Sequence, residues 1–173
     1  TVSPLYLTSV TVDGPAELHI VGSALHADTL VAGATAPWVE SEIHLSGGYL
    51  SGTTLQIGRD AGSNGNFIWD GGNLDVNRIS VGTAGSGTFV WSGTPVYNTY
   101  DVWNLAEHHS VVIGEHAGST GVFEQWRGTV ESWASSIVIG EAGNGTYRQI
   151  NSNHNARETV IGHQAGSVGT YEM

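Results

Sequence analysis

The sequence lacks several residues whose absence excludes whole classes of protein. It has no cysteine, so neither disulfides nor thiolate metal sites hold its fold together. It has no lysine: its five cations are all arginine, and against sixteen carboxylates they leave a net charge of −11. That charge has the wrong sign for binding a phosphate backbone. No apolar run approaches the ~20 residues that span a bilayer. The sequence therefore predicts neither nucleic acid as a partner nor insertion into a membrane.

Glycine is the residue that the sequence has in excess. There are 25 glycines among 173 residues, about twice the usual share, while only 12% of residues are charged. β-Branched and aromatic residues recur throughout, which favours an ordered chain rich in turns. The length predicts one domain over residues 1–173. The chain starts at Thr1, and we expect processing such as signal-peptide removal, hence an extracellular or cell-surface location; trimming is the alternative.

Two half-repeats alternate along the chain. The first is an apolar triplet that ends in glycine, as in VVIG, IVIG and TVIG at Gly114, Gly140 and Gly162. The second is a short strand-like stretch such as GTFVWSG or GTYRQIN. Successive glycines of the first half are 19, 25, 24, 32, 26 and 22 residues apart. Both halves alternate with period two, and no helical pattern lies between them.

This periodicity predicts an all-β fold, a right-handed parallel β-solenoid of about seven coils. In such a fold equivalent residues stack ~4.8 Å apart in columns along the axis. An antiparallel sandwich of hairpins is the alternative, but it leaves the columns unexplained. The clearest predicted column is inward-facing and contains Leu18, Ile43, Phe67, Phe89, Phe123, Tyr147 and Tyr171.

The turns after the triplets share the motif IGxxAGSxGT(F/Y), as in IGEHAGSTG and IGHQAGSVG. Together with the strands around it, this motif resembles the glycine-rich β-helical repeats of bacterial surface proteins, particularly autotransporter passenger domains, over residues 8–173. The resemblance implies a secreted protein with an adhesive or structural role. It implies no particular activity.

The two ends of the chain contain complementary parts of one repeat. The chain ends in GTYEM and begins with TVSPLYLTSVTVDG; joined, they span nineteen residues from Gly169 to Gly14, against eighteen from Gly145 to Gly162. Neither end has the capping segment that solenoids need. We therefore expect a structural protein and not an enzyme, with copies stacked head-to-tail into an extracellular homopolymer. A fragment of a longer solenoid is the alternative. The residues expected at the shared coil are Leu5, Leu7, Val10, Val12, Gly169, Tyr171 and Met173.

Outward-facing residues form further columns. Glu124, Arg148 and Glu172 predict an alternating charge ladder that favours one register. His19 and His44 are expected to stack, in a way more typical of surface histidines than of a metal site. A third column predicts an apolar stripe for lateral packing, unless a strand or loop of the same coil covers it. It consists of Val112, Val138 and Val160.

One insertion, at residues 94–110, breaks the repeat. Its rings could stack on sugars, so the competing function is an adhesin module that binds a cell-surface glycan. The same rings could anchor a neighbouring subunit or pack against the solenoid. The candidate side chains are Tyr97, Tyr100, Trp103, His108 and His109.

Carboxylates give little support for catalysis. Asp60, Asp70 and Asp75 are close in sequence but have turn-like contexts, and Arg59 and Arg78 are the only cations nearby. Enzymes of β-helix architecture that cleave acidic polysaccharides concentrate both charges in one groove, so such an activity is the least favoured function. No cofactor is expected, although calcium stays open because turn aspartates are hard oxygen ligands.

Overall fold

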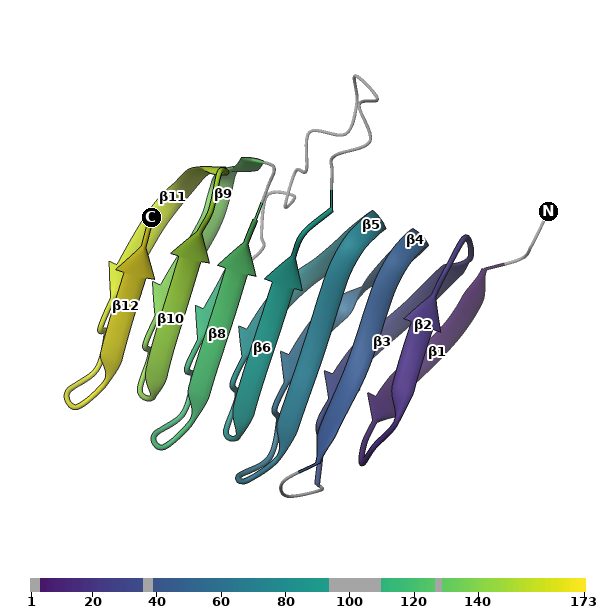
Figure 1. The fold of residues 1–173 in the computed structure, drawn as a ribbon, viewed down its shortest axis with the longest axis horizontal. Coiled ribbons are helices and arrows are strands. Elements are labelled where there is room, and N and C mark those ends of the chain that lie inside the picture. The colour runs from purple at the N-terminus through teal and green to yellow at the C-terminus, as the bar shows by residue number, and fades with distance from the viewer. Residues whose placement is uncertain (1–3, 36–38, 94–109, 127–128) are drawn as a thin grey trace.

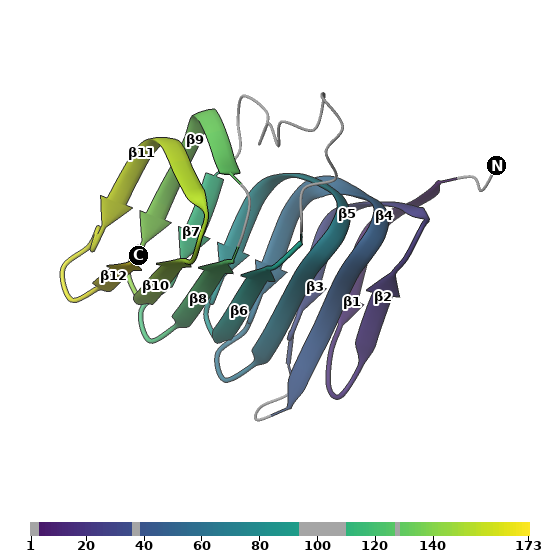
Figure 2. The same cartoon turned by 45° about the horizontal axis from the view of Figure 1, so that its top comes forward.

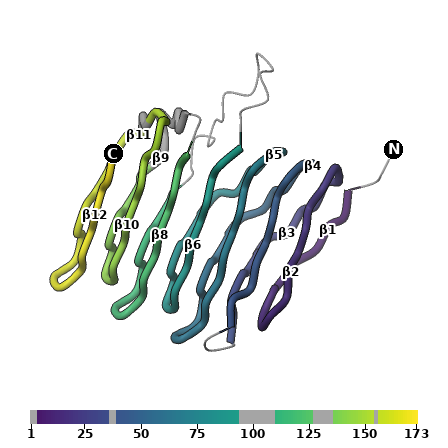
Figure 3. The backbone as a smooth tube through the Cα atoms, in the orientation of Figure 1, coloured from purple at the N-terminus to yellow at the C-terminus, as the bar shows by residue number. Residues whose placement is uncertain are grey.

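A computed structural model describes residues 4–35, 39–93, 110–126 and 129–173. Over these residues the chain is an all-β parallel solenoid of about six turns without a helix (Figure 1). The strands pair in parallel from one coil to the next, for example β4 with β5 and β8 with β10. The predicted all-β parallel β-solenoid is therefore confirmed, with about six turns where about seven coils were predicted, and the antiparallel sandwich is wrong. The repeats stack along one axis, and the N- and C-terminal coils lie at opposite ends of it (Figures 1 and 3).

The strands fall into two layers. The second half-repeats form the aromatic layer, which contains β2, β6, β8, β10, β12 and the N-terminal parts of β4 and β5. The triplets form the triplet layer, which contains β1, β3, β7, β9, β11 and the C-terminal parts of β4 and β5. The strands are β1 (Leu5–Val12), β2 (Glu17–Ile20), β3 (Ala24–Ala32), β4 (Glu40–Ile57), β5 (Asn64–Val81), β6 (Ser86–Trp91), β7 (Ser110–Ile113), β8 (Thr120–Gln125), β9 (Thr129–Ile139), β10 (Asn144–Gln149), β11 (Asn153–Ile161) and β12 (Val168–Glu172).

β5 shows how one turn is built. Phe67 and Trp69 point into the core, and the chain then bends at Gly72, where φ is +76°. The indole of Trp69 donates a hydrogen bond to the Gly72 carbonyl at 3.2 Å, which closes the bend. Beyond it, Leu74 and Val76 return to the core before the triplet begins. The strand therefore wraps around its own hydrophobic side, as Figure 2 shows.

The core consists of the predicted columns. The pairing register places Phe67, Phe89, Phe123 and Tyr147 on consecutive coils. Neighbouring rings stack with centroids 5.1, 4.5 and 5.3 Å apart. These separations follow from the ~4.8 Å spacing of parallel strands, because identical positions on adjacent coils face each other. The inward column predicted from the sequence is confirmed.

A glycine ends each triplet, and in the inner coils it lets the following coil approach closely, whereas an added Cβ at Gly14 or Gly162 would meet nothing within 4 Å. Gly114 has φ +70°, and a Cβ there would lie 2.5 Å from the carbonyl carbon of Asn144 on the next coil. Gly140 has φ +73°, and its Cβ would lie 2.6 Å from the carbonyl carbon of Val168. The repeat therefore requires glycine at this position for its backbone conformation and for its contact with the following coil.

Candidate assembly surfaces

The C-terminal end of the solenoid leaves its core uncovered. Ile161 on β11 is 51% exposed, whereas Ile139, one coil earlier in the same column, is fully buried. Met173 is 97% exposed, and Tyr171 is only partly buried although it stacks on Tyr147 at 5.1 Å. The backbones of β11 and β12 form the edge of this end. This end of the solenoid therefore combines exposed apolar side chains with the outer edges of two strands, on which a further strand could pair.

The N-terminal end is apolar as well. Leu5 and Leu7 on β1 are 56% and 39% exposed, and Val10 is half-buried. Val12 is only 7% exposed, so the exposed apolar area at this end is mainly that of Leu5 and Leu7. The structure therefore places the predicted joint residues at two opposite ends of one molecule, Leu5, Leu7, Val10 and Val12 at one and Gly169, Tyr171 and Met173 at the other.

The charge ladder is present at the C-terminal end. Arg148 donates from Nη1 to Glu124 at 2.8 Å and from Nε to Glu172 at 2.6 Å. The hydrogen bond to Glu124, followed by that to Glu172, raises the pKa of Arg148. Because Glu172 is on the last strand, the ladder ends in a carboxylate at the uncovered end.

At the N-terminal end the same column contains histidines. His19 on β2 and His44 on β4 have ring centroids 5.4 Å apart, with the rings edge to face. His19 lies 3.2 Å from Glu17, and His44 lies 2.9 Å from Asp70. Within the described part of the chain, no three His, Asp or Glu side chains converge as a metal site would need.

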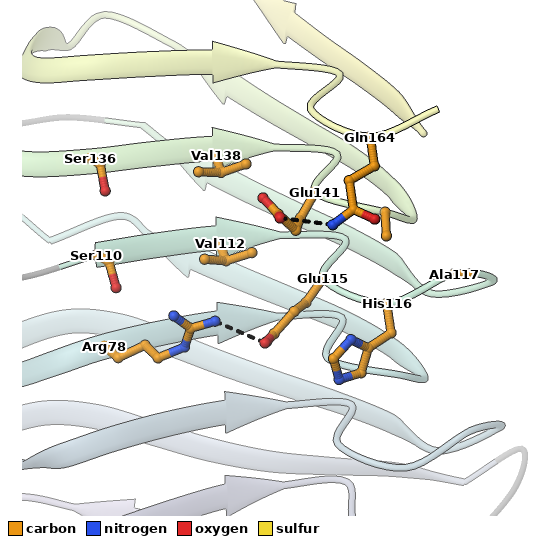
Figure 4. Close-up of a pocket in the computed structure, with 11 residues that line it drawn as sticks. Arg78, Ser110, Val112, Glu115, His116, Ala117, Ser136, Val138, Glu141 and Gln164 are labelled. Atoms are coloured by element: carbon orange, nitrogen blue, oxygen red, sulfur yellow. Dashed lines mark hydrogen bonds and ion pairs between the residues drawn. The ribbon is translucent and has the colours of Figure 1, made fainter. Parts of the chain in front are cut away.

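Two valines of the stripe, Val112 and Val138, line a pocket of about 420 Å³ (Figure 4). Val112 and Val138 stack in register on its floor, and Val160 follows on the next coil. The stripe is less open than its sequence suggests: Val112 is only 5% exposed, and Val138 and Val160 are half-buried. Two polar pairs border the floor.

The first polar pair joins Arg78 to Glu115 at 2.8 Å, and the second joins Gln164 to Glu141 at 3.1 Å. His163 also bonds Glu141, at 2.8 Å. Burial opposes ionisation of Glu141, but the hydrogen bonds from His163 and Gln164 outweigh it and lower the pKa of Glu141. The pocket therefore contains carboxylates already paired within the chain, over an apolar floor.

Two further groups of residues were predicted from the sequence, the aromatic insertion and three aspartates. Tyr97, Tyr100, Trp103, His108 and His109 lie outside the described residues, as does all of the insertion except Ser110. The three aspartates each have a different partner: Asp60 pairs with Arg59, Asp70 with His44, and Asp75 with Tyr49. They do not form one carboxylate cluster.

Two features are not among those that the sequence predicted. A tyrosine–glutamine ladder continues the core, with Tyr147 donating to Gln125 and Tyr171 donating to Gln149, each at 2.5 Å. The recurrence of glutamine two residues after the aromatic position, in FEQ and YRQ, is a signal that could have revealed it. The carboxylates beside the valine stripe are the second feature, and they follow the triplet glycines directly in GEH and GEA.

Comparison with family models, with curated proteins and with solved structures gives no match for this chain. The class of the protein is therefore defined by its fold, a parallel β-solenoid with glycine-rich repeats. In the described part of the chain no helix is long and apolar enough to cross a membrane.

Proposed function

We propose that this protein is a structural subunit that stacks head-to-tail with copies of itself into a filament with one continuous β-solenoid core. The observation that carries the proposal is the contrast between Ile161 and Ile139, which occupy the same column and differ only in having a coil beyond them. A coil placed on β11 and β12 buries this apolar end and pairs its strand edges. The N-terminal coil of a second copy has the geometry for that position.

Extending the register by one coil gives the expected pairs in the triplet layer. β1 is equivalent to β11 through the chain of pairings, so the Val10–Val12 triplet of a second copy falls on Thr159–Ile161. Val12 then covers Ile161, which is the contact that every inner coil makes at this position. Half-burying an isoleucine in this way is worth about 1 kcal/mol.

The aromatic layer extends in the same way. β2 is equivalent to β12, so Leu18 of the second copy falls on Tyr171 and Ile20 falls on Met173. Gly169 receives Ala16. Ser41 is buried at this position in one inner coil, whereas an added Cβ at the glycines of the later coils would lie 2.0–2.6 Å from a carbonyl oxygen of the preceding coil, so Ala16 requires the local spacing that Ser41 has. Leu7 is on β1 three residues before the triplet, so it falls near Ala156, three residues before Thr159 on β11, which is a looser match.

The setting that suits this role is outside the cell. The turn motif resembles repeats of bacterial surface proteins, and a chain without cysteine does not depend on a redox environment for its fold. We propose an extracellular or cell-surface location on that basis. The glycan-binding alternative depends on the aromatic insertion, whose residues 94–109 lie outside the described part, and no observation favours it.

The test is negative-stain electron microscopy and sedimentation of the purified chain. Filaments with an axial repeat of about 34 Å are the expected result, because each layer stacks seven strands per molecule at ~4.8 Å and the next copy continues the stack. Uniform single particles under all conditions contradict the proposal and mean that other segments cover the ends.

A pair of glycine variants tests the contact itself. Gly162 has φ +69° with nothing within 4 Å of an added Cβ. The same is true of Gly14 in the first coil, but at the five equivalents between them an added Cβ would contact the following coil, as at Gly114 and Gly140. Gly162→Ala should leave the single molecule folded and abolish stacking. Gly166→Ala is the matched control, because Gly166 has φ +87° and also an open Cβ direction, and its inner equivalent Gly118 touches no following coil. Equal filament formation by both variants contradicts the proposed joint.

A further inference from the structure

We propose that Glu172 of one copy pairs with His19 of the next, and that this contact sets the register of the joint and makes stacking stronger below neutral pH. The inference rests on the head-to-tail filament proposed above. It deepens that function because it names a recognition element and a regulating condition for the same joint.

The pairing follows from the register of the aromatic layer. His19 belongs to the column that continues through His44 and ends in Glu124, Arg148 and Glu172. Placing β2 of a second copy on β12 therefore puts His19 directly beside Glu172. A slip by one residue would instead turn the side chains of the whole strand to the opposite face, so the polar pair and the apolar contacts specify the same alignment.

The groups around this contact determine the sign of the pH effect. Glu172 is already bonded by Arg148, which shares its guanidinium with Glu124. His19 lies beside Glu17 on its own strand and beside His44 on β4, and His44 is paired with Asp70. A protonated His19 therefore lies between two carboxylates, Glu17 and Glu172. The side chain on β4 that could repel this positive charge is His44, which is itself paired with Asp70.

The charge balance at the joint changes with the state of His19. When His19 is neutral, no positive charge lies between Glu172 and Glu17, and the two carboxylates on facing strands repel each other. When His19 is protonated, it attracts both. Histidine is the side chain that changes charge between about pH 5 and 8, so the joint should strengthen as the pH falls through that range.

The experiment measures the critical concentration for filament formation by sedimentation at about pH 5.5 and about pH 7.5, on either side of the ordinary histidine range. An exposed ion pair changes affinity by roughly threefold, so the wild-type critical concentration should be at least threefold lower at the acidic pH. His19→Gln and Glu172→Gln should each reduce that ratio by about threefold, and the double variant should reduce it no further than either single variant.

Two further variants separate this contact from general charge effects. His19→Arg keeps a positive charge at both values, so it should stack at neutral pH as well as the wild type does in acid. His116→Gln removes a histidine from the connection between β7 and β8, in an inner coil away from the joint, and it should keep the wild-type ratio. An unchanged ratio in His19→Gln overturns the inference and leaves the filament intact. Absence of polymer at both pH values in the wild type overturns the filament and this inference together.

Discussion

The glycine at the end of each triplet should be the position where the solenoid is least tolerant of a single added methyl group. Gly114 is the best place to measure this, because it is in an inner coil, between β7 and β8. Gly118 lies four residues further along the same connection, has φ +84°, and has open space around an added Cβ. Gly114→Ala and Gly118→Ala therefore introduce the same methyl group at a similar backbone conformation, and only the first meets the next coil.

The expected difference can be worked out from the contacts. Alanine at a left-handed position costs about 1–2 kcal/mol, and about 0.4–1 kcal/mol of that is offset by the stiffer unfolded chain. Gly118→Ala should thus lower the free energy of unfolding by about 1 kcal/mol. Gly114→Ala must in addition push the Asn144–Gly145 backbone outward, since the new Cβ would lie 2.5 Å and 2.9 Å from its atoms.

That displacement also loosens the hydrogen bonds that the Gly114 carbonyl accepts from Glu141 at 3.0 Å and Gly143 at 3.1 Å. Overpacking of this kind costs about 1–3 kcal/mol, and each weakened hydrogen bond costs up to about 1 kcal/mol. Gly114→Ala should therefore be about 3 kcal/mol less stable than Gly118→Ala. Urea unfolding followed by circular dichroism measures the difference, and a thermal scan should show a melting temperature lower by about 6–12 °C. If the two variants unfold within about 0.5 kcal/mol of each other, which is the ordinary range for a neutral surface change, the coils are not in the close contact described.

Three other predictions follow from the core and its tyrosines. Phe89→Ala removes a fully buried ring that is stacked on both sides, and it should lower the free energy of unfolding by about 3–5 kcal/mol. Val90→Ala, on the outer face of the same strand, should lower it by under about 1 kcal/mol. Urea titrations of the two variants measure the difference. Tyr147→Phe leaves Gln125 without that donor and should cost about 1–3 kcal/mol, measured in the same way, and a neutral result would contradict the ladder. The hydrogen bond to Asp75, and after it burial, raises the pKa of Tyr49 to about 12. The stabilising effect of this hydrogen bond is therefore complete below pH 10 and is lost as the pH rises toward 12. Tyrosinate absorbance should show one late-titrating group fewer in Tyr49→Phe.

The repeat is predictable because each coil uses the same local rules. Alternation along the chain is enough to place Phe67, Phe89 and Phe123 in one column, and a column of equivalent positions requires parallel stacking. The charge ladder of Glu124, Arg148 and Glu172 is predictable for the same reason, since outward residues share the register of the inward ones.

The burial of Val112 is not predictable in this way. Alternation assigns it to the outer face, but Arg78 and Glu115, which are 37 residues apart, meet across adjacent coils at the edge of its pocket. The bond from Tyr147 to Gln125 is also invisible to local patterns, because it joins one coil to the coil before it.

The amino-acid sequence by itself determined the strands, their inward and outward faces, the glycine turns and the stacking of equivalent positions, because these depend on spacing along the chain and on the conformational freedom of single residues. Only the tertiary structure decided how exposed each position is, since exposure depends on which coil lies next to it: Ile139 and Ile161 occupy the same place in the repeat, and one is buried while the other is open.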